Sequence, residues 1–441
     1  MVEQRFRKPR VGGSNPLASS SIRGFEGTQL ARFREVLKER NFFLLWVGQI
    51  ISQFGDRLNL MALIALVHSR APGSAFELAK FLSLTMIPAF IVSPIAGAFV
   101  DRWNRKRTMI TCDILRGLLV LTIPVALLAL KPSFPIYTAV FLMFSVSCFF
   151  LPARLSIIPD LVSDDKLLAA NSLFNVTGMI GAITGVGVGG LLIELSGIKG
   201  GLYLNSAVYF SSAIAISFIV GKKHYIDSRL DSIKIKELIK TSLFREIKDG
   251  LNYLREHRDV KFVFNILFIL MAGAGASFAV AVVFIQEAMG SVTRDLSLLV
   301  LFLGGGFFVG SLLYGRFGHN IPKPKTIFAC LILSGSTMFI FTFLLKWTRS
   351  FGFVSIMATI LGTAIAPIGI SANTLIHEVI SEHMRGRIFS SLGIVMNFAL
   401  LVFMLIASRL AEYIDRSWIL YSVGIFYVVS GILGFLLRKE T

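Results

Sequence analysis

Uncharged stretches of membrane-spanning length recur along the whole chain. Clear examples are residues 132–153, 167–193, 200–221, 262–286 and 326–345. A helix needs roughly 20 apolar residues to cross the hydrocarbon core of a bilayer. In lipid the backbone must satisfy its own hydrogen bonds, so such stretches form helices. The pattern predicts an all-α membrane protein with twelve transmembrane helices, near residues 42–67, 79–100, 108–130, 135–158, 168–195, 201–220, 262–284, 297–315, 326–345, 352–377, 386–412 and 417–437.

Composition and charge place this chain in the membrane and indicate its orientation. It is 54% hydrophobic and only 16% charged, whereas a soluble domain carries about 25% charged residues. If the N-terminus is inside, the inside segments hold 33 of the 44 Lys and Arg residues and the outside loops hold seven. This asymmetry follows the positive-inside rule. We therefore expect a multi-pass plasma (inner) membrane protein with both termini cytoplasmic and lipid as a partner. Because the basic residues follow this inside–outside pattern, we do not expect the net charge of +18 to reflect a nucleic-acid partner.

Polar segments divide the chain into four parts. Residues 1–36 are basic, aperiodic and expected to be a disordered cytoplasmic N-terminus, followed by a six-helix bundle over 37–221. Residues 222–258 form a basic cytoplasmic linker whose apolar positions recur at helical spacing, and 259–441 form the second bundle. The linker helix either joins the two bundles or also lies on anionic lipid, and both interpretations remain open.

The two sets of spans match each other at a nearly constant offset. Gly97 corresponds to Gly315, and Arg105 corresponds to Lys323, both at an offset of 218 residues. Two like-oriented repeats of six helices are one known transporter architecture, with the substrate site between the repeats near the bilayer midplane. We therefore predict two six-helix pseudo-repeats that enclose a path for a small-molecule substrate.

The loop after the second span carries the clearest motif, which runs from Gly97 to Arg107 as GAFVDRWNRKR. It resembles the signature Gly-x-x-x-Asp-Arg/Lys-x-Gly/Asn-Arg-Arg/Lys of the major facilitator superfamily. The resemblance implies a gating latch in which Asp101 caps a helix of the other half. Arg102 and Arg105 would then reach a carboxylate near the end of the fourth span, for which Asp160 is the candidate. A carboxylate is stabilised at a helix N-terminus, and an arginine can pair with a carboxylate in bidentate geometry.

The second half carries an altered copy of this motif. His319 occupies the position equivalent to the aspartate, and Pro322 and Pro324 replace other motif positions. We therefore expect no matching latch in the second half.

Two further stretches resemble one branch of the superfamily. Residues 149–173 and 385–390 are similar to the branch that includes macrolide efflux proteins and enterobactin exporters. This resemblance implies a secondary active transporter that exports a hydrophobic or amphiphilic small molecule, either drug-like or siderophore-like. A lipid or lysophospholipid translocator and a nutrient uptake symporter remain alternatives within transport. A non-transporting receptor or scaffold is the alternative from another class.

Ionisable and polar side chains interrupt the predicted spans. Such residues are costly in a bilayer and usually face a cavity or a partner. We predict that Asp56 exchanges a proton during transport and that Arg57 or Arg116 modulates this exchange; a static ion pair is the alternative. The full set proposed for proton coupling and the central cavity is Gln49, Asp56, Arg57, Asn59, Asp113 and Arg116.

The fifth predicted span is rich in glycine, which lets helix backbones approach closely in membranes. Gly181, Gly185, Gly189 and Gly190 resemble the antiporter signature Gly-Pro-x-x-Gly-Gly of the superfamily, with Val186 where proline is usual. Close helix packing without any link to antiport is the alternative.

No catalytic or metal-binding pattern is present. The sequence has no His-Glu-x-x-His, Walker A or Gly-x-Ser-x-Gly stretch. We therefore expect no enzyme activity, no cofactor and no metal. Transport would draw on an ion gradient, most simply of protons, and we expect a monomer.

Overall fold

The computed structural model describes residues 33–100, 102–129, 134–220, 258–318, 321–379 and 385–437. Within these residues regular structure is entirely helical. The elements are α2 (Arg40–Arg70), α3 (Ala75–Ile91), α4 (Ser93–Val100), α5 (Arg105–Ala129), α6 (Phe134–Leu161), η1 (Asp164–Lys166), α7 (Leu167–Ser217), α9 (Arg258–Met289), α10 (Arg294–Phe317), α11 (Lys323–Trp347), α12 (Phe351–Val379), α13 (Arg385–Leu410) and α14 (Arg416–Leu437).

These helices account for all twelve predicted spans. Among the described residues, ten helices are long and apolar enough to cross a membrane. One of them, α7, covers two spans because the chain reverses at Gly197, whose φ of 71° suits glycine. A further span consists of α3 and α4, which are separated at Val92. Pro94 favours this break because it has no backbone N–H to bond across it. The predicted fold class is therefore confirmed.

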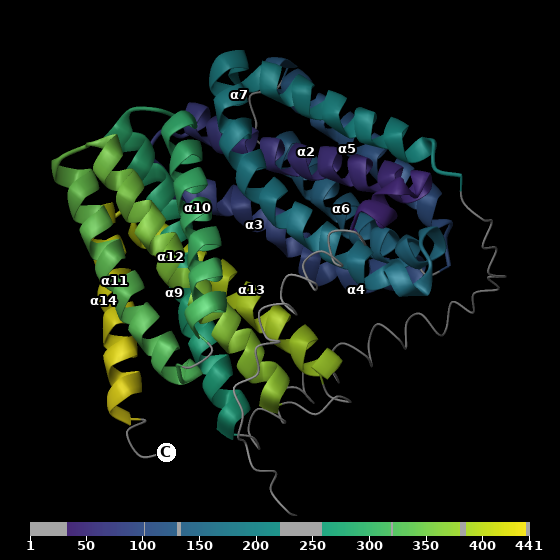
Figure 1. The fold of residues 1–441 in the computed structure, drawn as a ribbon. Coiled ribbons are helices and arrows are strands. Elements are labelled where there is room, and N and C mark those ends of the chain that lie inside the picture. The colour runs from purple at the N-terminus through teal and green to yellow at the C-terminus, as the bar shows by residue number, and fades with distance from the viewer. Residues whose placement is uncertain are drawn as a thin grey trace, which may run out of the picture.

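The helices form two bundles, which we call the N-half (α2–α7) and the C-half (α9–α14) (Figure 1). One end of the molecule carries the turns after α2, α9, α11 and α13 together with Gly197, and we call it the turn face. The opposite end carries the described chain ends at residues 33, 220, 258 and 437, and we call it the tail face.

The hydrophobic cores show how the halves are joined. One core cluster contains residues from both halves, including Leu58 and 61–67 of α2, Val283 of α9 and Met404 of α13. The other clusters each belong to one half, and all lie toward the tail face. The halves therefore share a core near the turn face and have separate cores near the tail face.

Polar contacts between the halves follow the same division. His68 Nδ1 lies 3.2 Å from Gln286 Oε1, and Ser74 donates to Glu412 at 3.2 Å. Arg416 donates to the carbonyl of Gly73 across the same junction. Every hydrogen bond described between the halves lies on the turn-face side. The structure is thus closed at the turn face.

The structure also bears on the predicted boundaries. Residues 33–38 are helical and Val36 is fully buried, so the expected disorder up to residue 36 is wrong for 33–36. The apolar spacing there lets this short segment pack on the N-half core. Residues 1–32 and 221–257, which include nearly all of the predicted linker, lie outside the described residues.

Candidate functional site

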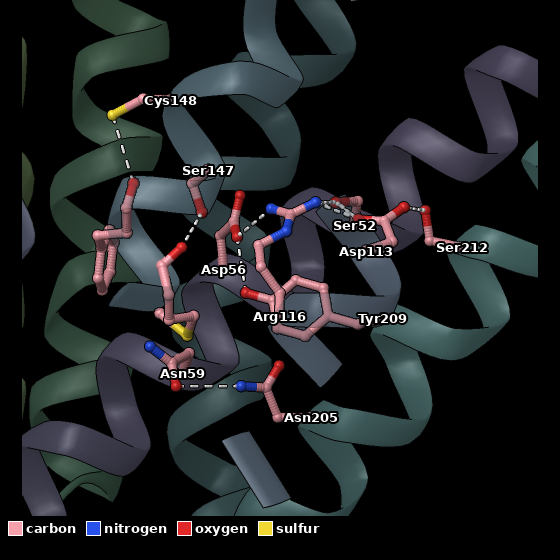
Figure 2. Close-up of polar contacts among 12 residues, drawn as sticks. Ser52, Asp56, Asn59, Asp113, Arg116, Ser147, Cys148, Asn205, Tyr209 and Ser212 are labelled. Carbon is pink, nitrogen blue, oxygen red and sulfur yellow. Dashed lines mark hydrogen bonds and ion pairs between the residues drawn. The ribbon is translucent and has the colours of Figure 1, made fainter. Parts of the chain in front are cut away.

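A cluster of charged side chains lies inside the N-half, and Arg116 of α5 is at its centre (Figure 2). Its side chain is 1% exposed. Arg116 Nη1 donates to Asp56 Oδ1 at 3.1 Å, and Nη2 donates to Asp113 and to Ser52 Oγ at 2.8 Å. The guanidinium also stacks on the rings of Phe150 and Tyr209, each 4.6 Å away. Arg116 therefore bridges two carboxylates on two helices.

Asp113 is the fully enclosed member of this cluster. It lies one turn before Arg116 on α5, and its side chain is 0% exposed. Its second oxygen accepts a hydrogen bond from Ser212 of α7 at 2.6 Å, and Ser52 donates to the first at 3.2 Å. A buried ion pair is tolerated only when further hydrogen bonds satisfy its remaining sites. The two serines supply these bonds to Asp113, whereas Arg116 Nε is buried without a hydrogen-bond partner among the described residues.

Asp56 is the accessible member of the cluster. It lies near the middle of α2, yet its side chain is 39% exposed. Its Oδ1 accepts from Arg116 and also from the hydroxyl of Tyr209 at 2.7 Å. In Figure 2, Asp56 lies on the side of the cluster toward Ser147 of α6, away from Asp113 and Ser212. The cluster therefore combines one enclosed carboxylate with one that is partly exposed.

The cluster forms because three helices approach closely at glycines. A Cβ at Gly55 would lie 3.1 Å from Tyr209, and one at Gly48 would lie 2.7 Å from Ile216. On α5, a Cβ at Gly117 would lie 3.0 Å from Phe210. Larger side chains at these positions would push α2 and α5 away from the second part of α7, and the cluster would separate.

Polar residues next to the cluster are incompletely paired. Asn205 donates to Asn59 at 3.2 Å, which leaves Asn59 Nδ2 and Asn205 Oδ1 buried without a partner. Gln49 is 2% exposed, and its Oε1 also has no partner. Buried polar atoms in this state commonly hold ordered water. The segment from Gln49 to Asn59 therefore carries a polar stripe on the otherwise apolar helix α2.

Arg57 does not join the cluster. It is exposed and points toward α7, where a Cβ at Gly185 would lie 3.0 Å from its side chain. Of the two arginines considered as partners of Asp56, only Arg116 contacts it. The reason is that adjacent helical residues point about 100° apart.

The four glycines of α7 face two different helices. Gly181, Gly185 and Gly189 approach α2, and the Cβ of an alanine at Gly189 would lie 3.3 Å from the Cα of Leu58. Gly190 faces α10 of the other half, where Thr293 donates to its carbonyl at 2.9 Å. These glycines therefore pack α7 both within the N-half and across to the C-half.

The motif after the second span is described in part. Arg105 donates to Asp160 in the last turn of α6 at 2.6 Å, which is a pair that the resemblance implied. Arg102 makes no ion pair with a described residue, and Gly97 has open space around its Cβ position. Asp101 lies outside the described residues, so its predicted capping role stays a prediction.

An equivalent ion pair is present in the second half. Lys323 donates to Glu378 at 2.5 Å, and both residues lie 218 positions after Arg105 and Asp160. The second half therefore keeps this one contact of the motif, and the expectation that no matching latch works there stays a prediction. Pro322 and Pro324 do not disturb the ion pair because proline is accepted at the first turn of a helix, and α11 begins at Lys323.

Sequence reasoning did not identify Tyr209 or Ser212 as members of the site. The two residues lie three positions apart on the second part of α7, among apolar neighbours, and carry no charge that would mark them. The available signal was their helical spacing with Asn205 and Ser206, which places a polar stripe on one face. Among the described residues, no group of three His, Cys, Asp or Glu side chains is placed to hold a metal ion.

Comparison with known proteins agrees with this architecture. The chain is 27% identical over 360 residues to "Putative bacilysin exporter BacE" of Bacillus subtilis (strain 168), covering 80% of this chain and 84% of that protein. It is 23% identical over 390 residues to macrolide efflux protein A of Streptococcus pyogenes, covering 86% and 92%. The fold is similar to a bacterial homologue of the iron transporter ferroportin in an inward-facing state, with a TM-score of 0.69, 13% identity and coverage of 91% and 99%. It is also similar to the nucleoside transporter NupG, with a TM-score of 0.68, 12% identity and coverage of 91% and 100%.

The sequence matches the Major Facilitator Superfamily twice, over residues 45–290 and 262–441. The two matches begin in α2 and α9, which are the first helices of the two bundles. Two six-helix bundles paired in this way are the architecture of a membrane transporter. The chain belongs to the Major Facilitator Superfamily.

Proposed function

We propose that this transporter exports a hydrophobic or amphiphilic small molecule by proton-coupled alternating access, and that Asp56 carries the proton. The observation behind the proposal is the placement of Asp56, which is 39% exposed and in contact with the buried Arg116. Export is supported by the similarity to the bacilysin and macrolide efflux proteins. We further propose that the tail face is cytoplasmic, in line with the excess of basic residues predicted there, so that the described conformation is open to the cell interior.

The charge balance of the cluster gives Asp56 its role. Two carboxylates surround one guanidinium, so the cluster has a net charge of −1 when both are ionised. A net charge inside a membrane protein is costly to enclose. When Asp56 takes up a proton, the enclosed Asp113–Arg116 pair remains neutral by itself. Protonation of Asp56 therefore favours closure around the cluster. Release of the proton then accompanies opening to the other side of the membrane.

The hydrogen bond from Tyr209 couples this event to helix position. Tyr209 lies on α7 and Asp56 on α2, and their oxygens are 2.7 Å apart. A protonated carboxyl group is a weaker acceptor than a carboxylate, whose hydrogen bonds are roughly twice as strong as neutral ones. Loss of the charge on Asp56 therefore loosens the junction of α2 with α5 and α7.

The proposal is tested in everted membrane vesicles from an efflux-deficient bacterial host, with ethidium and erythromycin as probes. The wild-type chain is expected to accumulate a probe only when a proton gradient is imposed, and to release protons when the probe is added. Asp56→Asn is expected to abolish both signals. Asp164→Asn, which removes an exposed carboxylate of η1, is the matched control and keeps them.

Two results would refute the proposal. Probe-driven proton movement that persists in Asp56→Asn would remove this residue from the coupling step. Accumulation that depends on the gradient of another ion would show that this ion, and not the proton, is coupled to export.

Two other results would favour the alternative functions. Altered phospholipid content of the host with unchanged drug susceptibility would favour the lipid translocator, and probe accumulation in right-side-out vesicles would favour uptake.

A further inference from the structure

A groove lies on the N-half near the tail face, away from the charged cluster. Its volume is about 560 Å³. It lies between the start of α5, the segment before α5 and the adjacent part of α6. Its lining residues are Arg102, Trp103, Asn104, Arg107, Thr108, Thr111, Cys112, Leu115, Val146 and Phe149.

One end of the groove is polar and positively charged. Arg102 and Arg107 lie there, and neither forms an ion pair with a described residue. No lining residue is acidic. Asn104 accepts a hydrogen bond from the backbone N–H of Arg107 at 3.0 Å, which caps the start of α5 beside the two arginines. This end is therefore suited to a phosphate group, which arginine binds through several hydrogen bonds.

The other end of the groove is apolar and continues along the helix surface. Leu115, Val146 and Phe149 form its floor. Trp103 is 48% exposed and stacks on Phe149, with ring centroids 5.8 Å apart and an angle of 14°. Leu115 is 42% exposed and Leu118, one turn further along α5, is 49% exposed. An exposed apolar surface of this kind suits contact with hydrocarbon, so acyl chains of a lipid in the groove would extend along α5.

We propose that this groove binds an anionic phospholipid. The phosphate lies against Arg102 and Arg107, and the acyl chains lie along Leu115 and the exposed surface of α5. Trp103 sits at the level where tryptophan is enriched in membrane proteins, between the headgroups and the hydrocarbon. Two cations in a lining that contains no acidic residue favour a lipid with net negative charge over a zwitterionic one. A free phosphate ion would leave the apolar floor uncovered, so the lipid is the better match.

The site has a direct connection to the ion pair described above. Arg102 and Arg107 flank Arg105, which holds Asp160 of α6. A phosphate held by the two outer arginines reduces the repulsion among three neighbouring cations. A bound anionic lipid therefore stabilises the junction between α5 and α6.

Native mass spectrometry of the purified full chain tests the proposal. The protein in detergent is titrated with dioleoyl-phosphatidylglycerol, with dioleoyl-phosphatidylcholine and with inorganic phosphate, in separate series. We expect tighter binding of phosphatidylglycerol than of phosphatidylcholine and no retained phosphate. Each basic residue near an anionic surface strengthens binding roughly fivefold, so the double substitution Arg102→Gln with Arg107→Gln is expected to weaken phosphatidylglycerol binding about 30-fold.

The matched control is Arg316→Gln with Lys325→Gln, which removes the same charge from exposed tail-face positions in the C-half. This control is expected to bind phosphatidylglycerol like the wild type. A third variant, Leu115→Trp, fills the apolar end without a change in charge and is expected to weaken binding of both lipids.

The proposal is refuted if the wild type does not prefer phosphatidylglycerol, or if the control loses affinity as much as the groove variant. Retention of inorganic phosphate with equal affinity would show an anion site and also overturn the assignment to lipid.

Discussion

Gly190→Ala is expected to open the turn face. Gly190 lies on α7 where this helix crosses α10 of the other half. A Cβ at this position would lie 1.6 Å from Ser297 Oγ, 2.7 Å from Ser297 Cβ and 2.9 Å from the carbonyl oxygen of Thr293. The serine hydroxyl can rotate, but the other two atoms are fixed to the helix. An alanine therefore forces α7 and α10 apart in the described conformation.

The size of the effect follows from the cost of overpacking. Inserting one extra methyl group into a packed interface costs about 1–3 kcal/mol. The cost applies to the conformation closed at the turn face, because α7 and α10 separate when that face opens. Since every 1.4 kcal/mol is a factor of ten, the equilibrium is expected to shift about 5- to 150-fold toward the open conformation.

Distance measurement by electron spin resonance in lipid nanodiscs is the suitable assay. Spin labels replace Leu195 at the turn-face end of the first part of α7 and Trp347 at the end of α11, which are 85% and 71% exposed. The native cysteines are first replaced by alanine. The long-distance population is expected to rise in Gly190→Ala, and to fall again when Ser297→Gly is added.

Gly305→Ala on α10 is the matched control, because nothing lies within 4 Å of a Cβ there. Its distance distribution is expected to equal that of the parent. If Gly190→Ala also leaves the distribution unchanged, or if the serine substitution fails to reverse it, the contact between α7 and α10 does not hold this face closed.

Three further predictions concern other parts of the molecule. Tyr209→Phe removes the hydroxyl that donates to Asp56 at 2.7 Å while keeping the ring on Arg116, so we expect slower probe-driven proton release in vesicles and a somewhat lower melting temperature. Gly306→Ala places a Cβ 2.0 Å from a carbonyl oxygen of α12 within the C-half, so melting in detergent is expected to occur at lower temperature with no change in the turn-face distance. Asp415 caps α14, and the hydrogen bond that it accepts from Ser417 lowers the pKa of Asp415 from 3.8 to about 2. The stabilisation that the ionised cap gives is therefore present above pH 4 and is lost as the pH falls toward 2. Asp415→Ala is expected to cost about 1 kcal/mol of stability at neutral pH, measured by denaturation, and a cost that stays the same at pH 2 would contradict this reasoning.

Much of the fold was predictable because the bilayer sets the length of an apolar helix. The spans around Gly197 were placed correctly because glycine and charge mark the turn at residues 196–200. The break at Val92 was not predicted, since the apolar run continues through it and only the prolines mark it. Helix boundaries shifted by a few residues where charged side chains extend a helix beyond the apolar core, as at Arg105.

Only the charged residues of the site could be predicted from the sequence. Asp56, Asp113 and Arg116 were identified because ionisable residues within spans are rare. Their arrangement required the structure, because residue spacing does not tell which of Arg57 and Arg116 reaches Asp56 across helices. Tyr209 was missed for a related reason, since a buried tyrosine is ordinary in a membrane helix until its hydroxyl is seen 2.7 Å from a carboxylate.

The core shared by the two halves has a thermodynamic consequence for the transport cycle. Met61, Val283 and Met404 are each at most 3% exposed in the described conformation. These side chains lose part of this burial if the turn face opens to water. Exposure of apolar surface raises the heat capacity, so the enthalpy of this step rises with temperature. Hydrophobic burial also weakens on cooling. The rate of turnover is therefore expected to give a curved Arrhenius plot when turn-face opening limits it.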